Sequence, residues 1–226
     1  MTRGCRFCSK KAMGHFGREA SLWDRVILES SSFVAVPTLG AIVEGWVLLV
    51  PKMHYLCIGA MDNHLFPELH EFQKLVCRMV QDCYGPVAVF EHGPARPRQA
   101  IGCGVDHAHL HVLPTACDLV SGVREISNEP LEWQSVQGIQ DTKAFYSAGL
   151  PYLYVEQPTG RSRLTTHPNI QSQLFRRVVA AYEGRAHRYD WQAYPDEHNI
   201  RSSIGAFETW LSRNREMSFQ PGQGVL

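Results

Sequence analysis

The sequence predicts an α+β fold that is built on an antiparallel sheet. Two apolar segments rich in β-branched residues, 33–36 and 45–50, precede one long amphipathic helix, and two more strand-like segments, 86–90 and 107–113, follow it. A parallel sheet needs helices that alternate with its strands, whereas these strands stand on either side of a single helix. The chain has 226 residues, of which 44% are apolar and 19% charged, as in an ordinary globular protein with a sizeable core.

Proline, glycine and apolar spacing set the expected ends of these elements. Pro37 ends the first strand and Pro51 the second, which predicts a hairpin. Asp62 is expected to cap the helix, which continues to Gly85. Its apolar positions recur at steps of three and four residues: Leu65, Leu69, Phe72, Val76 and Met79. The segment 91–104 is rich in glycine and proline and is predicted to be a loop.

The pattern changes beyond about residue 118. A strand is expected at 152–155, followed by two amphipathic helices. The first has Pro168 at its start and an apolar stripe that reaches Tyr182, and the stripe of the second includes Ile200 and Leu211. Such stripes are more often core than ligand contacts, so we expect this part of the chain to pack against the sheet.

Charge and apolar runs exclude several classes of protein. The 22 Lys and Arg residues balance 22 Asp and Glu residues, so no global field attracts nucleic acid or an anionic membrane. The longest apolar stretch, 36–50, contains Pro37 and Glu44 and is too short to span a bilayer. The N-terminal residues lack the apolar segment of a secretory signal. We expect a cytoplasmic protein that binds neither nucleic acid nor membrane.

Three histidines carry the most informative pattern in the chain. His107, His109 and His111 alternate with apolar residues and precede Pro114. On a strand, alternate side chains share a face, so the imidazoles are expected in a row about 7 Å apart. Neutral imidazole is both a metal ligand and a nucleophile near neutral pH. The row therefore indicates a metal site or a nucleophilic site, with a solvated strand face as the alternative.

Cys5 and Cys8 form the one closely spaced cysteine pair among seven cysteines. Zinc, redox thiols and a disulfide all use the Cys-x2-Cys spacing. Redox pairs usually open a helix in a strand-helix-strand unit, which does not surround this pair. A structural zinc needs two further ligands. The pair by itself leaves all three interpretations open.

The His-x-His-x-His pattern resembles the motif of the histidine triad (HIT) superfamily of nucleotide hydrolases and transferases. The segment LVPKMH at 49–54 and the helix that follows it stand in the order typical of that family. The likeness covers roughly residues 1–118. It implies a HIT-like catalytic domain at 1–118, and we expect residues 119–226 to form a C-terminal extension with two amphipathic helices, packed on the same core.

The resemblance implies a covalent mechanism. The middle histidine, His109, would attack the α-phosphorus of a nucleotide and form a nucleotidyl-histidine, while its other nitrogen donates to a backbone carbonyl of the motif. His111 would donate to the phosphate. Hydrolysis of a phosphoanhydride or phosphoramidate bond is expected, in a substrate such as a dinucleoside polyphosphate or a nucleoside phosphoramidate. Glutamine is typical at the third triad position of the uridylyltransferase-like branch, which favours hydrolysis here.

Two other functions remain open at this point. One is a nucleotidyltransferase or phosphorylase, with chemistry like that of galactose-1-phosphate uridylyltransferases. The other is a nucleotide-binding protein without turnover. Proteins of the resembled family commonly form homodimers by pairing their sheets. The extension can cover that surface here, so a homodimer and a monomer both remain open.

The resemblance also implies a structural zinc. In bacterial HIT proteins and in galactose-1-phosphate uridylyltransferases, two cysteines are joined by the histidine after Pro-Lys-x and by the first triad histidine. The expected ligands in this chain are Cys5, Cys8, His54 and His107.

The remaining substrate contacts are expected in the segment before the triad. Glu91 or His92 would contact a ribose hydroxyl, as the corresponding region does in the resembled proteins. Arg96 and Arg98 would pair with phosphate oxygens through their guanidinium forks. Backbone N–H groups around Gly104 would form an anion-binding nest.

Overall fold

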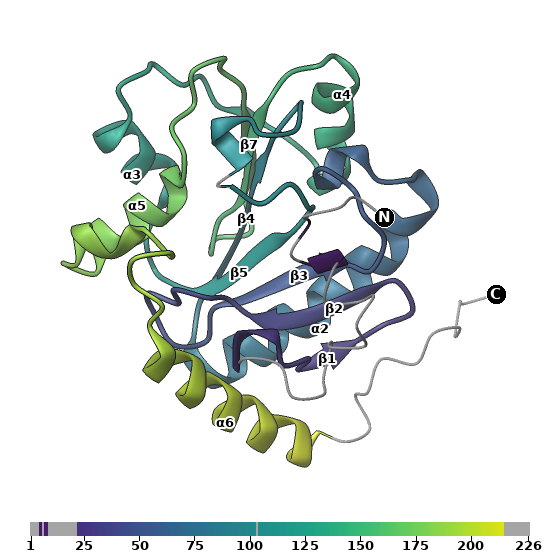
Figure 1. Cartoon of the computed structure of the whole chain (residues 1–226), viewed down its shortest axis with the longest axis vertical. Helices are drawn as coiled ribbons and strands as arrows, with labels where there is room; N and C mark the ends of the chain where they lie inside the picture. Colours follow the sequence, from purple (N-terminus) through teal and green to yellow (C-terminus); the bar gives the residue numbers. More distant parts are fainter. Residues whose placement is uncertain (1–4, 6, 9–21, 103, 215–226) are drawn as a thin grey trace.

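An eight-stranded antiparallel sheet organises the part of the chain that the computed structural model describes, which is residues 5, 7–8, 22–102 and 104–214 (Figure 1). Its strand order is β1-β2-β3-β5-β4-β7-β8-β6, and every neighbouring pair is antiparallel. The strands are β1 (Leu28–Glu29), β2 (Phe33–Pro37), β3 (Val47–Pro51), β4 (Val87–Gly93), β5 (Leu110–Pro114), β6 (Gln134–Ser135), β7 (Tyr152–Glu156) and β8 (Ser162–Thr165). The predicted α+β class with an antiparallel sheet is confirmed.

Helices cover both faces of this sheet. They are α2 (Phe66–Tyr84), α3 (Leu119–Ile126), α4 (Thr142–Ser147), α5 (Leu174–Tyr182) and α6 (Glu197–Arg213). Short 3-10 helices lie at Leu22–Asp24, Ile58–Ala60, Asn63–Leu65, Ala100–Gly102, Ile139–Asp141 and Ala186–Tyr189. The apolar side of α2 packs on one face, and α3 and α5 pack on the other, where they lie side by side in Figure 1. Helix α6 contributes to both cores.

The elements with local signals agree with the prediction. Strands β2 and β3 form the expected hairpin, with Val34 opposite Val50. Helix α2 ends before Gly85, whose φ of 98° is a conformation that glycine adopts readily. Its start differs, because α2 begins at Phe66 and Asp62 precedes a 3-10 turn. The Asp62 carboxylate accepts a hydrogen bond from the Tyr55 hydroxyl at 2.8 Å and makes no capping bond.

Strand β4 is longer than predicted. It continues to Gly93, so Glu91 and His92 lie in a strand, whereas the sequence predicted a loop from 91 onward. The reason is its pairing with β7, in which Gly93 lies opposite Tyr152. A Cβ atom at Gly93 would lie 2.1 Å from Cζ of Tyr152, so only glycine allows this close approach.

Strand β5 is shorter than predicted. It begins at Leu110, which leaves His107 and His109 in the segment before it. In that segment the backbone N–H of Ala108 donates to the carbonyl of Tyr55 at 2.7 Å. The ring centroids of His109 and His111 are 5.0 Å apart, so the expected row at strand spacing is not formed.

Strands from the second half of the chain extend the same sheet. Strand β7 matches the strand expected at 152–155 and joins β8 and β6 to β4. Helix α6 carries the expected stripe, whereas α5 begins at Leu174 and Pro168 lies outside it. Strands from before and after residue 118 therefore belong to one continuous sheet. The division of the chain at that residue stays a prediction. Residues 215–226 of the expected extension lie outside the described residues.

None of the helices in the described ranges combines the length and the apolar character that a membrane crossing requires. The stretch 1–16, on which the expectation of no secretory signal rests, lies mostly outside those ranges.

Candidate active site and metal centre

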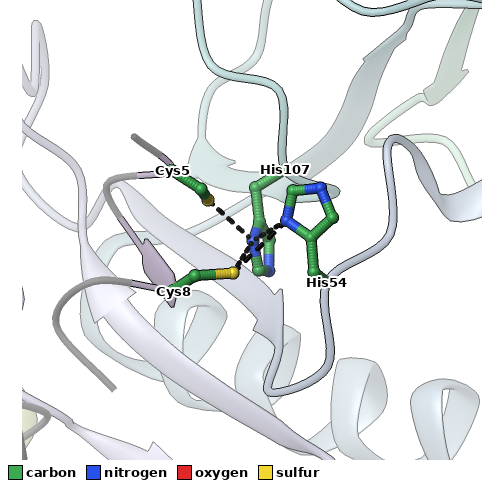
Figure 2. A group of neighbouring side chains, drawn as sticks. All are labelled: Cys5, Cys8, His54 and His107. Carbon is green, nitrogen blue, oxygen red and sulfur yellow. Dashed lines mark hydrogen bonds between the residues drawn. The ribbon is translucent and has the colours of Figure 1, made fainter. Parts of the chain in front are cut away.

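Four metal-ligating side chains converge beside the end of β3 (Figure 2). Cys5 and Cys8 come from the N-terminal segment, His54 follows β3, and His107 precedes β5. One ligand atom from each lies within 4.8 Å of all the others. Nδ1 of His107 is 3.3 Å from Sγ of Cys5 and 3.3 Å from Nδ1 of His54, which in turn is 3.3 Å from Sγ of Cys8.

This donor set fits the predicted zinc. Two thiolates and two imidazoles are a usual tetrahedral set for structural Zn²⁺. The ring of His107 is oriented for the purpose, because its Nε2 lies 2.9 Å from the carbonyl oxygen of Pro51. A proton on Nε2 that donates to this carbonyl leaves the Nδ1 lone pair directed at the other donors. The cluster of Cys5, Cys8, His54 and His107 can hold a metal ion, and the cofactor prediction is confirmed.

His109 has one ring nitrogen fixed by the backbone. Its Nδ1 lies 2.7 Å from the carbonyl oxygen of His107, so Nδ1–H donates there and Nε2 keeps its lone pair. The side chain lines a cavity. Burial lowers the pKa of His109 and the positive charge of Arg176 adds to this effect, against the bond to the His107 carbonyl, which raises it. The neutral ring with Nε2 unprotonated is therefore the favoured state.

His111 has the opposite tautomer. The indole N–H of Trp46 donates to Nδ1 of His111 at 3.1 Å, so the proton of the neutral ring is on Nε2. The ring also stacks on Phe90, with centroids 4.4 Å apart. Burial lowers the pKa of His111 well below its usual value, and the neighbouring groups His109, His92 and Arg176 lower it further. His111 is thus a neutral hydrogen-bond donor through Nε2.

The cavity that His109 and His111 line has apolar walls and a charged side. Its space is about 540 Å³, part of it open to solvent, which suits a small-molecule ligand. The apolar lining consists mainly of Phe7, Trp23, Leu39, Leu48, Val105 and Trp191. Asp24 and Arg176 add one negative and one positive side chain, and both are buried. Flat apolar walls beside polar groups can accommodate a planar ring that carries a charged substituent.

Glu91 does not line this cavity, so the structure does not place it where the predicted ribose contact was expected. Successive side chains of β4 point to opposite faces of the sheet, and Glu91 points to the face that α2 covers. Its carboxylate accepts hydrogen bonds from the backbone N–H of Ile58 at 2.7 Å and from the hydroxyl of Tyr152 at 2.6 Å. Burial raises the pKa of Glu91 to about 7, against the effect of both bonds.

His92 lies on the same face of the sheet as the cavity, next to His111, but it does not reach the cavity. The two ring centroids are 6.1 Å apart, and Nε2 of His92 accepts a hydrogen bond from the backbone N–H of Phe175 at 3.3 Å. Burial lowers the pKa of His92 to about 3, with smaller contributions from His109 and Arg176, so its ring is neutral. His92 is not among the cavity-lining residues, and its ribose contact stays a prediction.

Arg96, Arg98 and Gly104 lie on the protein surface and do not line the cavity. The backbone N–H of Arg98 donates to the carboxylate of Asp106 at 3.0 Å. Arg98 and Gly104 line a separate hollow together with Asp106 and Ser172. Because β4 continues to Gly93, the loop starts at Pro94, three residues later than predicted, and both arginines are exposed in it. The predicted phosphate contacts of Arg96 and Arg98 are therefore not brought to His109.

Several residues that line the cavity or contact its histidines were missed by the sequence analysis. Trp46 precedes β3, and Leu48 two residues later lies opposite His111, so knowledge of this pairing would have placed Trp46 on the His111 side. Arg176 and Trp191 come from the second half of the chain, and no local motif marks either. Trp23 and Asp24 belong to a single 3-10 turn without a recognisable pattern.

Comparison with known proteins gives the family. A family model described as "Protein similar to CwfJ C-terminal" matches residues 5–121, slightly more than half of the chain. The chain belongs to this family. The match includes all four residues of the metal cluster and the triad segment. No match was found among curated proteins.

Solved structures with a partial likeness include three from different organisms. A hypothetical histidine triad nucleotide-binding protein of Sulfolobus tokodaii is 24% identical with a TM-score of 0.40, over 49% of this chain and 68% of that one. A zinc-bound histidine triad family protein of Mycobacterium smegmatis is 16% identical with a TM-score of 0.38, over 65% and 92%. The yeast Ap4A phosphorylase in complex with AMP is 12% identical with a TM-score of 0.41, over 80% and 79%. Because these TM-scores are below 0.5, the assignment rests on the family model.

Proposed function

We propose that the protein is a HIT-like enzyme that hydrolyses a phosphoanhydride or phosphoramidate bond at the α-phosphorus of a nucleotide. The observation that carries the proposal is the hydrogen bond of Nδ1 of His109 to the carbonyl of His107 at 2.7 Å. This bond leaves Nε2 with its lone pair on a side chain that lines the cavity. An imidazole in this state attacks without first losing a proton.

The proposed first step is attack of Nε2 of His109 on the α-phosphorus. The new P–N bond uses the nitrogen lone pair, and the bond from phosphorus to the leaving group breaks with its electron pair. The ring then carries a positive charge, which the His107 carbonyl stabilises through the Nδ1–H bond. In the second step a water oxygen attacks phosphorus, one water proton is released, and the nucleotide leaves His109 in its original state.

His111 is proposed to assist the first step. Trp46 holds its ring so that Nε2 carries the proton. Nε2–H can then donate to a phosphate oxygen or to the departing group. A positioned hydrogen-bond donor of this kind contributes about 10² to 10³ in kcat.

The metal cluster is proposed to have a structural role. Zinc, when bound, would cross-link the N-terminal segment to His54 and His107 without contributing to bond cleavage. His107 also provides the carbonyl that orients His109, so the cluster and the nucleophile share one residue. The N-terminal segment contributes Phe7, which lines the cavity. Loss of the metal should therefore disturb both His109 and the cavity wall.

Product analysis tests the proposed reaction. The purified, zinc-loaded protein is incubated with diadenosine tetraphosphate and with adenosine phosphoramidate, each with and without phosphate, and the products are separated chromatographically. AMP that forms without phosphate supports the hydrolase. Products that require phosphate would instead indicate a phosphorylase. Absence of turnover together with nucleotide binding would indicate the non-catalytic alternative.

A further inference from the structure

Arg176 is a buried cation from α5 that reaches the cavity of His109 and His111. The residue is 2% exposed. Its Nε donates to the carbonyl of Tyr189 at 2.9 Å, and one terminal nitrogen donates to the carbonyl of Gly40 at 2.6 Å. Its guanidinium carbon lies 4.9 Å from the centroid of the Trp46 ring. The guanidinium is therefore held in one orientation by two backbone segments and one aromatic ring.

The side chain brings a positive charge to the cavity. A guanidinium stays protonated under all ordinary conditions. Arg176 lines the same cavity as His109 and His111, and the Trp46 ring beside its guanidinium donates a hydrogen bond to His111. Among the described residues that line the cavity, Arg176 is the one permanent cation. A ligand with a negative group would meet this charge in the cavity that the two histidines line.

The backbone around Gly40 also allows this arrangement. Gly40 has φ of 72°, and a Cβ atom there would lie 2.9 Å from the terminal nitrogen of Arg176 and 2.7 Å from Cα of Trp191. Glycine thus lets the hairpin turn approach both cavity residues from the second half of the chain.

We propose that Arg176 is a substrate-binding residue whose guanidinium binds the phosphate group that His109 attacks. The inference rests on the proposed function, since it uses the same cavity and nucleophile. It has two consequences. The substrate is recognised as a nucleotide through its phosphate, and the chain beyond the family-matched segment 5–121 completes the active site. A planar guanidinium suits this task because it can donate two parallel hydrogen bonds to phosphate oxygens.

A purely structural role for Arg176 makes a different prediction. If the residue only joined Gly40 to Tyr189, its loss would lower the stability of the protein. It would also weaken the binding of nucleosides and of nucleotides to the same extent. If Arg176 binds phosphate, its loss weakens the binding of nucleotides selectively. A comparison of each nucleoside with its 5′-monophosphate separates the two roles.

The test measures binding by isothermal titration calorimetry on the full-length, zinc-loaded protein. The ligands are adenosine, guanosine, cytidine and uridine, each with its 5′-monophosphate. The variants are Arg176→Gln, Arg176→Lys and the control Arg201→Gln. Arg201 is exposed on α6 and pairs with Glu197 at 3.7 Å, so this control removes the same charge away from the cavity. Thermal unfolding of each variant accompanies the titrations.

Arg176→Gln should raise the Kd of the tightest-binding monophosphate about 10- to 100-fold, as expected for loss of charge-assisted hydrogen bonds. The Kd of the corresponding nucleoside should change less than about threefold. Arg176→Lys keeps the charge and should bind the monophosphate more tightly than Arg176→Gln. If the Gln variant does not fold, a selective, several-fold loss in the Lys variant supports the proposal. Arg201→Gln should bind as the wild type does.

Two results would overturn the inference alone. They are wild-type affinity for the monophosphate in Arg176→Gln, or an equal loss for nucleoside and monophosphate in a folded Arg176 variant. A wild-type protein that binds none of the four monophosphates would instead remove the proposed function, and this inference with it.

Discussion

The two cavity histidines differ at the level of single hydrogen bonds. His109 donates through Nδ1 to a backbone carbonyl, whereas His111 accepts at Nδ1 from the indole of Trp46. Nε2 is therefore unprotonated in His109 and protonated in His111. One hydrogen-bond partner sets the tautomer of each ring. Substitution of a partner side chain therefore tests the assignment.

Trp46→Phe should lower kcat about tenfold and change KM less than twofold. The phenyl ring keeps the packing against Phe90, but His111 loses the donor that fixes its proton on Nε2. The loss of one hydrogen bond worth about 1.4 kcal/mol corresponds to this factor. Steady-state kinetics on a cleaved nucleotide measures it.

Trp210→Phe is the matched control for this prediction. Its indole N–H donates to Asp82 at 2.9 Å, away from the cavity. Its kcat should equal that of the wild type. Equal kinetics in both Trp variants would show that the Trp46 bond has no role in turnover.

Glu91→Gln should remove a pH dependence of stability. Burial raises the pKa of Glu91 from 4.5 to about 7 in the folded protein, so the folded state holds the proton more tightly than the unfolded state. The stabilisation is complete below about pH 4.5 and is lost as pH rises toward 7. The wild type should therefore lose up to roughly 3 kcal/mol relative to Glu91→Gln across this window.

Denaturant unfolding of wild type and Glu91→Gln at several pH values gives this difference. The amide keeps the acceptor for the N–H of Ile58, so the variant is expected to fold. A pH-independent difference between the two proteins would show that Glu91 does not titrate between pH 4.5 and 7.

At the scale of elements, the N-terminal segment and the hairpin are joined through the metal cluster. Cys5 and Cys8 lie in that segment, and His54 follows the second hairpin strand. Phe7, between the two cysteines, packs its ring against His107 with centroids 5.3 Å apart. The position of the triad segment thus depends on residues about one hundred positions earlier in the chain.

Cys8→Ser should reduce bound zinc from about one ion per chain to a small fraction, and it should lower the midpoint of thermal unfolding. A structural zinc contributes its binding free energy to folding, and a hydroxyl replaces the thiolate poorly. Elemental analysis of dialysed protein measures the stoichiometry. Cys83→Ser, on α2 and outside the cluster, is the control that should keep full zinc. Unchanged zinc in Cys8→Ser would exclude Cys8 as a ligand.

Phe207→Ala should destabilise the protein by about 3 to 5 kcal/mol, because a fully buried aromatic side chain leaves a cavity. Phe207 lies on α6 and its ring contacts Tyr84 of α2 with centroids 6.0 Å apart. Tyr182→Ala on α5 is the control, since Tyr182 is 55% exposed and should cost less than about 1 kcal/mol. Similar unfolding free energies for both variants would show that α6 does not share the core of α2.

At the scale of the molecule, local patterns were predictable and distant pairings were not. The hairpin and α2 follow from proline positions and apolar spacing. The extent of β4 depends on β7, about sixty residues later, and this pairing moved Glu91 from the expected site into the core. The family resemblance predicted the metal cluster, and the structure brings its four residues together. It also predicted His109 as the nucleophile, and the structure places His109 in the cavity lining. Arg176 was missed, because its place in the cavity arises only when α5 packs on the sheet.

The two halves of the chain contribute to one sheet and one cavity. The sheet passes from β5 and β4 to β7 and β8, and Arg176 and Trp191 complete the lining that His109 and His111 begin. A division of the chain at residue 118 would separate these groups. We therefore expect the site to require both halves.

The most direct test of the account is the turnover of His109→Ala. Because a covalent route has no substitute for its nucleophile, the activity on the nucleotide that the wild type cleaves should fall below about 1% of wild type, with unchanged thermal unfolding and zinc content. The control His198→Ala, at an exposed position of α6, should keep full activity. Residual activity above about 1% in folded, zinc-loaded His109→Ala would contradict a nucleotidyl-histidine at this residue.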